Sequence, residues 1–293
     1  MADLSQVNKT VQLPVGIAVF PYLQDHRFEG NAVFPAVEGM QVLAQAVKEF
    51  APETDITVTM DTIFEKFLFI APNTKKIDAL CSITLFENGD ITAVLQTKTR
   101  SKNTAITRIK EHVTVCYPCI KPEFAAYLHN PLSFRESDFL KISPDQVYHE
   151  LVPFGPAYQN ISENLAIHKN GALATLQAPI IGDAIDPTGQ LGSPFVLDAA
   201  FHAACVWGQR HSGMVAFPVG VEKRLIIKPT RPGETYISTA IAVRTDSDML
   251  IFDICIYDED NTLYEIALGV QMRDVSGGRI KPPAWIRESR GKI

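Results

Sequence analysis

The chain has 293 residues, of which 46% are hydrophobic and 20% are charged, so its composition is that of a globular protein rather than a disordered or fibrous one. The formal net charge of −6 excludes general nucleic-acid binding, which needs a basic surface to neutralise phosphates. No hydrophobic run approaches the roughly 18 residues of a membrane span. The first ten residues lack the pattern of a secretory signal, and we therefore expect a cytoplasmic protein without a membrane partner.

Two helices are predicted, over residues 35–50 and 194–209. Each begins with a proline, which suits the first turn of a helix, and each is hydrophobic nearly all round, as is typical of a helix buried by surrounding structure. Alternating hydrophobic and β-branched residues predict four strands after each helix. In chain order, these strands are residues 57–70, 77–86, 91–100 and 106–116, then 215–227, 235–244, 249–257 and 263–273.

The two halves of the chain resemble each other. Residues 64–72 read FEKFLFIAP and residues 221–229 read VEKRLIIKP, and each segment follows one of the predicted helices. The shared order of helix, Glu-Lys strand and hairpins favours an internal duplication. A sheet curled round one hydrophobic helix is the hotdog arrangement, so we expect an α+β double hotdog that forms a pseudo-dimer. The predicted divisions are residues 1–140, residues 141–276 and a tail or linker at 277–293.

His26 is the first candidate for chemistry. Residues 26–35 have the spacing H-x3-G-x4-P, and Pro35 opens the first predicted helix. A base in this place stands close to the backbone N–H groups and the positive dipole end of the helix, which can stabilise an anion. Gly30 would let a ligand approach the backbone. We therefore expect His26 to act as a general base.

Asp198 is the second candidate, with His202 four residues later on the same face of the second helix. A carboxylate in the first turns of a hydrophobic helix is costly to bury without a partner. Burial should raise the pKa of Asp198 and keep it protonated, as a general acid requires. His202 is either an assisting group or a buried hydrogen-bonding residue.

These residues resemble the dehydratase domains of modular polyketide synthases, a double-hotdog family. Its motifs are H-x3-G-x4-P, L-D-x3-(Q/H), which residues 197–202 match, and G-Y-x-Y-G-P-x-F, which residues 151–158 echo. A fourth, L-P-F, is approximated by residues 217–219. Val152 and Phe154 stand where the third motif has tyrosines, so the hydrogen bond that a family tyrosine gives to the acid or the substrate must come from elsewhere. Tyr158 is the candidate substitute.

The resemblance implies a dehydratase that removes water from a 3-hydroxyacyl thioester and leaves an α,β-enoyl thioester, in polyketide or polyketide-like fatty acid biosynthesis. His26 would be the base and Asp198 the acid, assisted by His202, with no metal and no diffusible cofactor. The implied substrate-binding residues are Gly30, Phe34, Pro35, Gly155, Pro156, Tyr158 and Phe217. The implied partners are an acyl carrier protein, whose phosphopantetheine holds the substrate, and other polyketide synthase domains. A homodimer is also compatible with the resemblance.

Three other functions fit the same residues. A product-template cyclase shares the fold and the histidine–aspartate pair, and a double-bond isomerase needs the same acid and base. The absent tyrosines leave a third alternative open, a non-catalytic module that binds an acyl carrier protein.

Overall fold

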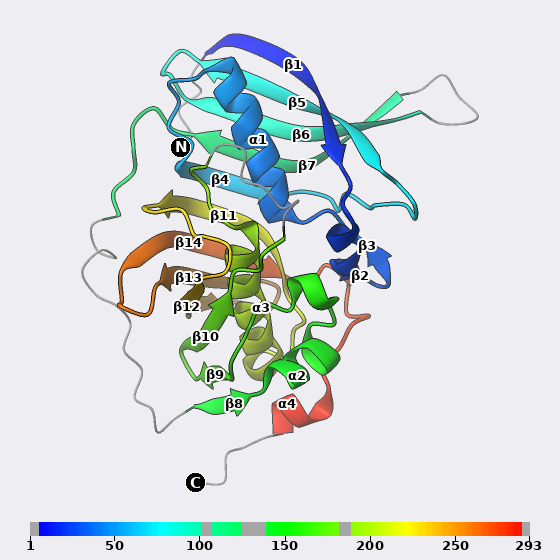
Figure 1. Ribbon diagram of the computed structural model, residues 1–293, viewed down its shortest axis with the longest axis vertical. Coiled ribbons are helices and arrows are strands. Elements are labelled where there is room, and N and C mark those ends of the chain that lie inside the picture. Colours follow the sequence, from blue (N-terminus) through cyan, green and yellow to red (C-terminus); the bar gives the residue numbers. More distant parts are fainter. Residues whose placement is uncertain (1–5, 101–106, 125–138, 182–188, 289–293) are drawn as a thin grey trace.

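The computed structural model describes residues 6–100, 107–124, 139–181 and 189–288. Its framework is one twelve-stranded sheet with the strand order β1-β5-β6-β7-β4-β11-β14-β13-β12-β10-β9-β8 (Figure 1). The two central strands, β4 (Val58–Phe64) and β11 (Phe217–Ile226), pair antiparallel and join the halves. The first Glu-Lys repeat begins at Phe64, the last residue of β4, and the second begins at Val221 of β11, which lies opposite Thr62, so the two repeats start close together at the middle of the sheet.

The first half of the chain curls five strands round helix α1 (Ala36–Phe50). Its other strands are β1 (Val7–Ala18), β5 (Lys76–Phe86), β6 (Ile91–Arg100) and β7 (Thr107–Tyr117). Leu43 and Val47 of α1 are completely buried against this sheet, whereas Gln45 and Glu49 are exposed. The helix therefore has one solvent-exposed stripe, and the expectation that it is hydrophobic all round is too strong.

The second half repeats the plan with helix α3 (Pro194–His211), which is buried on every side from Pro194 to Gln209. Figure 1 shows α1 and α3 on the same side of the sheet, one in front of each half. The other strands of this half are β8 (Leu140–Ile142), β9 (Leu165–His168), β10 (Gly171–Gln177), β12 (Thr235–Thr245), β13 (Leu250–Tyr257) and β14 (Leu263–Arg273).

The predicted strand over residues 57–70 is wrong beyond Phe64. Residues 65–70 leave the sheet and run beside the segment that precedes α1, where the Phe34 amide donates to the Leu68 carbonyl and the Ile70 amide to the Ala32 carbonyl. This departure brings the aromatic residues of the segment to the site described below. The strands β1, β8, β9 and β10 were not predicted. Of these, β1 and β8 are sheet edges, and most of β1 is partly or fully exposed, so it lacks a strong hydrophobic pattern.

The tail packs against the body of the protein as a strap. Before the short helix α4 (Ala284–Glu288), the Arg279 guanidinium donates to both carboxylate oxygens of Glu29. Within α4, the Trp285 indole donates to Glu150. Residues 125–138, just before the expected division at residue 140, lie outside the described part of the chain, and this division stays a prediction.

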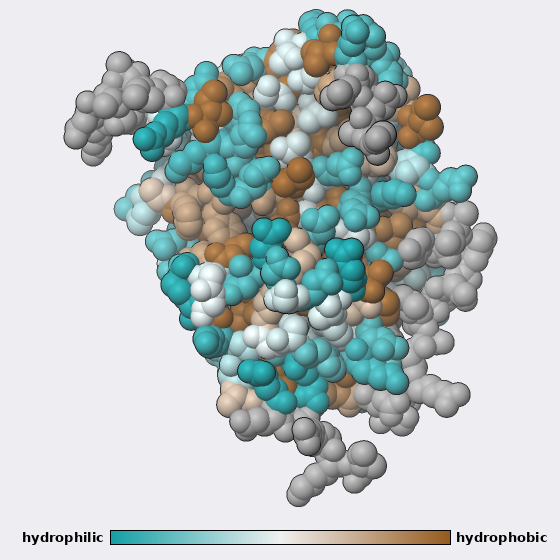
Figure 2. Space-filling view, turned by 180° about the vertical axis from the view of Figure 1, so that it is seen from behind, coloured by the Kyte–Doolittle hydropathy of each residue, from teal (hydrophilic) through white to brown (hydrophobic). Residues whose placement is uncertain are grey.

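The described surface is of mixed polarity. Seen from behind, hydrophobic and hydrophilic residues are intermingled (Figure 2). Across the described ranges, no helix combines the length and hydrophobicity that a membrane crossing needs. All five cysteines are free thiols.

Candidate active site

A tight hairpin positions His26. The residue follows the short helix η1 (Pro21–Asp25) and leads into the two-residue strands β2 (Arg27–Phe28) and β3 (Asn31–Ala32). Glu29 and Gly30 form the turn with positive φ angles of 48° and 79°, a conformation that glycine adopts without strain. The hairpin brings Val33 back to His26, so that the Val33 amide donates to the His26 carbonyl and His26 Nδ1 donates to the Val33 carbonyl at 3.0 Å.

The hydrogen bond to Val33 fixes the tautomer of neutral His26. Since a carbonyl can only accept, the proton lies on Nδ1 and the lone pair on Nε2. Aromatic rings enclose the imidazole, with the centroid of Phe154 at 4.5 Å and that of Tyr158 at 5.1 Å. Burial lowers the pKa of His26 below its ordinary value, against the opposing charge of Asp198. His26 is therefore held neutral with a free basic nitrogen.

Asp198 lies between two histidines. Its Oδ1 is 3.9 Å from Nε2 of His26, and its Oδ2 is 3.0 Å from Nε2 of His202. The contact with His202 is too bent for a directed hydrogen bond, so the attraction between these two groups is mainly coulombic. Residues that are 172 positions apart in the sequence thus share one buried centre, with Asp198 only 6% exposed.

The expectation that burial keeps Asp198 protonated is wrong for the free protein. Burial alone would raise the pKa of Asp198, but the neighbouring His202 and His26 lower it by more, and the net pKa lies below the ordinary value. From the sequence, only His202 was expected beside Asp198, whereas the fold also brings His26 to it. The carboxylate and the two imidazoles must therefore be treated as one coupled group.

Tyr148 is a residue of this centre that the sequence did not reveal. It lies in the π-helical turn η3 (Val147–Leu151), is buried, and its hydroxyl oxygen is 3.4 Å from His202 Nδ1. The same oxygen accepts from the Ile161 amide at 2.8 Å. Tyr148 thus holds His202 from the side opposite Asp198, although no motif marked it.

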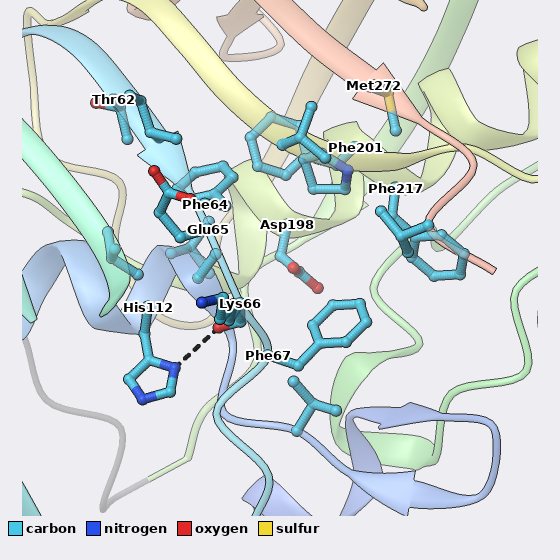
Figure 3. Close-up of a pocket in the computed structure, with 18 of the residues that line it drawn as sticks. Thr62, Phe64, Glu65, Lys66, Phe67, His112, Asp198, Phe201, Phe217 and Met272 are labelled. Carbon is cyan, nitrogen blue, oxygen red and sulfur yellow. Dashed lines mark hydrogen bonds between the residues drawn. The ribbon is translucent and has the colours of Figure 1, made fainter. Parts of the chain in front are cut away.

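A pocket of about 1000 Å³ leads to the centre. Its outer lining includes exposed residues such as Glu65, Lys110 and Glu222, and its inner lining includes the buried residues Phe201 and His202. Figure 3 shows the Asp198 carboxylate pointing into the space beside Phe67 and Phe217 of the lining. A mainly hydrophobic pocket with a few polar groups at its inner end is suited to a hydrophobic chain that carries one reactive polar group.

The segment after β4 supplies much of the pocket wall. Phe67 packs against Phe28 with tilted rings at a centroid distance of 4.6 Å, and Phe28 packs edge-on against Phe217 at 5.2 Å. The main chain of the segment is held by His112, whose Nδ1 donates to the Lys66 carbonyl at 2.9 Å (Figure 3).

Two of the seven expected substrate-binding residues, Phe34 and Phe217, line the pocket. The other five do not. Gly30 lies at the exposed tip of the hairpin. Gly155 meets the first half of the chain, where an added Cβ would lie 2.4 Å from Asp25 Oδ1.

Pro35 and Pro156 stand at the starts of α1 and of the turn η4 (Pro156–Tyr158), and the ring of Tyr158 packs behind His26. These residues support the site, and their direct contact with a substrate stays a prediction.

Tyr158 is not the expected substitute for the family tyrosine. Its hydroxyl donates to Glu38 Oε1 at 2.8 Å and so is committed to a different carboxylate from that of Asp198. The nearest phenol to the Asp198–His202 pair is that of Tyr148. Among the described residues, no group of three or more His, Cys, Asp or Glu side chains is arranged to hold a metal ion.

The start of α1 provides donors for an anion. Ala36 and Val37 both line the pocket, and the first amides of a helix have no acceptor within it. Ala36 and Val37, rather than Gly30, are therefore the residues at the pocket whose amides could stabilise an anion beside His26.

Comparisons with known proteins agree with this geometry. Residues 135–279 match the family described as polyketide synthase dehydratase N-terminal domain. A relative named highly reducing polyketide synthase 17, from Metarhizium anisopliae, is 23% identical over 256 residues, which are 78% of this chain. The chain spans only 8% of the length of that relative.

Solved structures share the fold over nearly the whole chain. A trans-AT polyketide synthase dehydratase domain from Brevibacillus brevis has a TM-score of 0.68 at 18% identity, covering 91% of this chain and 94% of that one. The dehydratase domain from the CurF module of the curacin polyketide synthase has a TM-score of 0.69 at 20% identity, with coverages of 92% and 96%.

A third structure, the dehydratase domain of PpsC from Mycobacterium tuberculosis in complex with C12:1-CoA, has a TM-score of 0.65 at 19% identity, with coverages of 91% and 94%. The predicted α+β double-hotdog fold is confirmed. The second half of the chain thus matches the polyketide synthase dehydratase family, and the chain as a whole shares the fold of solved dehydratase domains.

Proposed function

We propose that this chain removes water from a 3-hydroxyacyl thioester and leaves the α,β-enoyl thioester. The observation that carries the proposal is the 3.9 Å separation of His26 Nε2 and Asp198 Oδ1 at the inner end of a hydrophobic pocket. An elimination needs a base at the α-carbon and a proton source at the β-hydroxyl, and these lie on neighbouring atoms of one substrate. Two groups this close can reach both positions, because proton transfer requires hydrogen-bond range at each.

His26 is the base in this mechanism. Its Nε2 carries the free lone pair because Nδ1 donates to Val33, and its lowered pKa keeps it neutral at neutral pH. Removal of the α-proton places negative charge on the thioester oxygen. The first-turn amides of α1, at Ala36 and Val37, are in position to stabilise that charge.

The proton for the departing hydroxyl comes from the pair formed by Asp198 and His202. Because Oδ2 and Nε2 are only 3.0 Å apart, the pair acts as one group, and for catalysis it must hold one proton more than a carboxylate beside a neutral imidazole. The active form then has a neutral His26 and a pair that can release one proton through Asp198 to the hydroxyl. After water leaves, the proton taken up by His26 returns to the pair across the 3.9 Å gap, which restores the starting state.

The substrate enters as a thioester on the phosphopantetheine arm of an acyl carrier protein. A pocket of about 1000 Å³ has room for an arm together with an acyl chain, within the usual 300–1,000 Å³ range of ligand sites. In this elimination the protein exchanges only protons with the substrate, so the reaction calls for no metal and no diffusible cofactor. In this proposal the chain works in the cytoplasm beside other polyketide synthase domains, with residues 1–140 supplying the base and 141–276 supplying the acid.

The test is a turnover assay on a panel of 3-hydroxyacyl thioesters, with mass spectrometry of the products. Wild-type protein should yield the enoyl thioester, and His26→Phe should lower the rate by about 100- to 10,000-fold. His149→Phe is the matched control, because the His149 side chain is exposed and does not line the pocket. Binding of the thioester without any change of mass sinks the proposal in favour of a binding module. A shifted double bond or a cyclised product would favour the isomerase or the cyclase.

A further inference from the structure

A second carboxyl group, that of Glu38, is connected to His26 through the ring of Tyr158. Glu38, in the first turn of α1, accepts a hydrogen bond from the Tyr22 hydroxyl on Oε2 at 2.9 Å and one from the Tyr158 hydroxyl on Oε1 at 2.8 Å. Glu38 is partly buried and does not line the pocket. It therefore does not touch a substrate there, and its role must be exerted through the two tyrosines.

The bond between Glu38 and Tyr158 joins the two halves of the double hotdog. Glu38 and Tyr22 come from the first half, whereas Tyr158 lies 120 residues beyond Glu38 and belongs to the second. Tyr158 is only 1% exposed, so its hydroxyl is costly to leave without an acceptor. Because hydrogen bonds to a charged group are short and strong, a carboxylate is the most effective acceptor for two buried hydroxyls.

The ring of Tyr158 connects this arrangement to the base. It meets the His26 imidazole edge-on at a centroid distance of 5.1 Å and at an interplanar angle of 64°. Phe154 covers another side of the imidazole, and Val33 holds Nδ1. The position of the Tyr158 ring thus limits how far His26 can turn away from Asp198.

We propose that Glu38 is a positioning residue: by holding the Tyr158 hydroxyl across the two halves, it fixes the ring that keeps His26 Nε2 aimed at the reacting carbon. The inference rests on the proposed dehydration for its activity readout. The geometry of His26 itself can be measured without any turnover.

Protonation of Glu38 disturbs this arrangement. Both tyrosines donate to the carboxylate, so a proton on Glu38 takes away one of its two acceptor positions and leaves one hydroxyl to turn elsewhere. Burial raises the pKa of Glu38 to about 7, against the hydrogen bonds of the tyrosines. The titratable groups that face Glu38 are Tyr22 from η1, Tyr158 from η4 and Asp198 from α3.

The experiment compares Glu38→Leu, Glu38→Gln and Tyr158→Phe with wild type. Glu38→Leu removes both acceptors and should lower kcat by about ten- to a hundredfold with KM nearly unchanged, since a small misplacement of a catalytic group is enough for such a loss. Glu38→Gln should lower kcat by less than Glu38→Leu, because its amide oxygen, like the oxygen of a protonated carboxyl, still accepts from one of the two hydroxyls. The double variant Glu38→Leu/Tyr158→Phe should be no slower than the slower single variant, since both break the same bond.

The pH profile separates positioning from mere folding. In wild type, the acid limb of kcat should combine the protonation of Glu38 near pH 7 with that of His26 at lower pH. In Glu38→Gln only the His26 step remains, so the limb should move to lower pH and become less steep. Glu49→Gln, on the exposed stripe of the same helix, controls for the loss of one negative charge.

Additive losses in the double variant, or wild-type kcat in a folded Glu38→Leu, would overturn the inference. If wild-type protein turns over no thioester, the proposed function fails while the inference is still testable, because NMR follows the His26 imidazole directly. Positioning then predicts a shifted and broadened His26 signal in Glu38→Leu and an unshifted one in Glu49→Gln. An unshifted signal in both variants overturns it.

Discussion

Replacement of Glu38 by glutamine should change how the stability of the protein depends on pH. The pKa of Glu38 rises from an ordinary value of 4.5 to about 7 in the folded protein. Between these values the folded state binds more protons than the unfolded state, so the group makes the protein less stable as pH rises from 4.5 to 7. At 1.36 kcal/mol per pKa unit, the full loss is at most about 3 kcal/mol, and partial exposure of Glu38 reduces it.

Urea denaturation at a series of pH values measures this effect. The free energy of unfolding of wild type minus that of Glu38→Gln should fall by about 1–3 kcal/mol from pH 4.5 to pH 8. Subtraction removes the titration of all other groups, and Glu49→Gln on the same helix serves as the control for the charge. A difference that is constant or that rises with pH would refute the reasoning, because it would mean that the fold does not raise the pKa of Glu38.

Three further substitutions test separate parts of the structure. Gly155→Ala should lower the free energy of unfolding by about 1–3 kcal/mol, because its Cβ would lie 2.4 Å from Asp25 Oδ1; unchanged stability in denaturation would contradict this close approach. Tyr148→Phe removes the hydroxyl beside His202 and should cost about 1–2 kcal/mol of stability and lower kcat more than it alters KM, so a wild-type kcat would exclude a role for the phenol. Phe67→Ala at the pocket wall should raise KM about tenfold for long acyl thioesters and much less for short ones. An equal effect on both would show that the acyl chain of the substrate does not contact Phe67.

The large elements were predictable because their signals are local. A proline marks the start of each buried helix, and the predicted strands at residues 91–100 and 263–273 coincide with β6 and β14. The end of β4 was missed because residues 65–70 keep a strand-like composition while they pair with the segment before α1. Strand pairing of that kind depends on which partner is in reach, which a single sequence does not state.

The site was predictable only where a motif carried it. His26 and Asp198 were found from their spacing to neighbouring residues, and the fold brings them together. Tyr148 and Glu38 were missed, because their partners lie 54 and 120 residues away and no local pattern marks such contacts. The direction of the Asp198 pKa shift was wrong for a different reason: His202, four residues away on the same helix, lowers the pKa most, and His26 adds to this effect across the interface of the two halves.

The central claim is that His26 and Asp198 perform one elimination as a unit. Its most direct test is the single-turnover rate of dehydration of a 3-hydroxyacyl thioester by wild type, His26→Phe, Asp198→Asn and the double variant, with substrate binding measured in parallel. The account predicts that each single variant binds the thioester but loses about 100- to 10,000-fold in rate, and that the double variant is hardly slower than either. A single variant that dehydrates at the wild-type rate, or losses that multiply in the double variant, would contradict it.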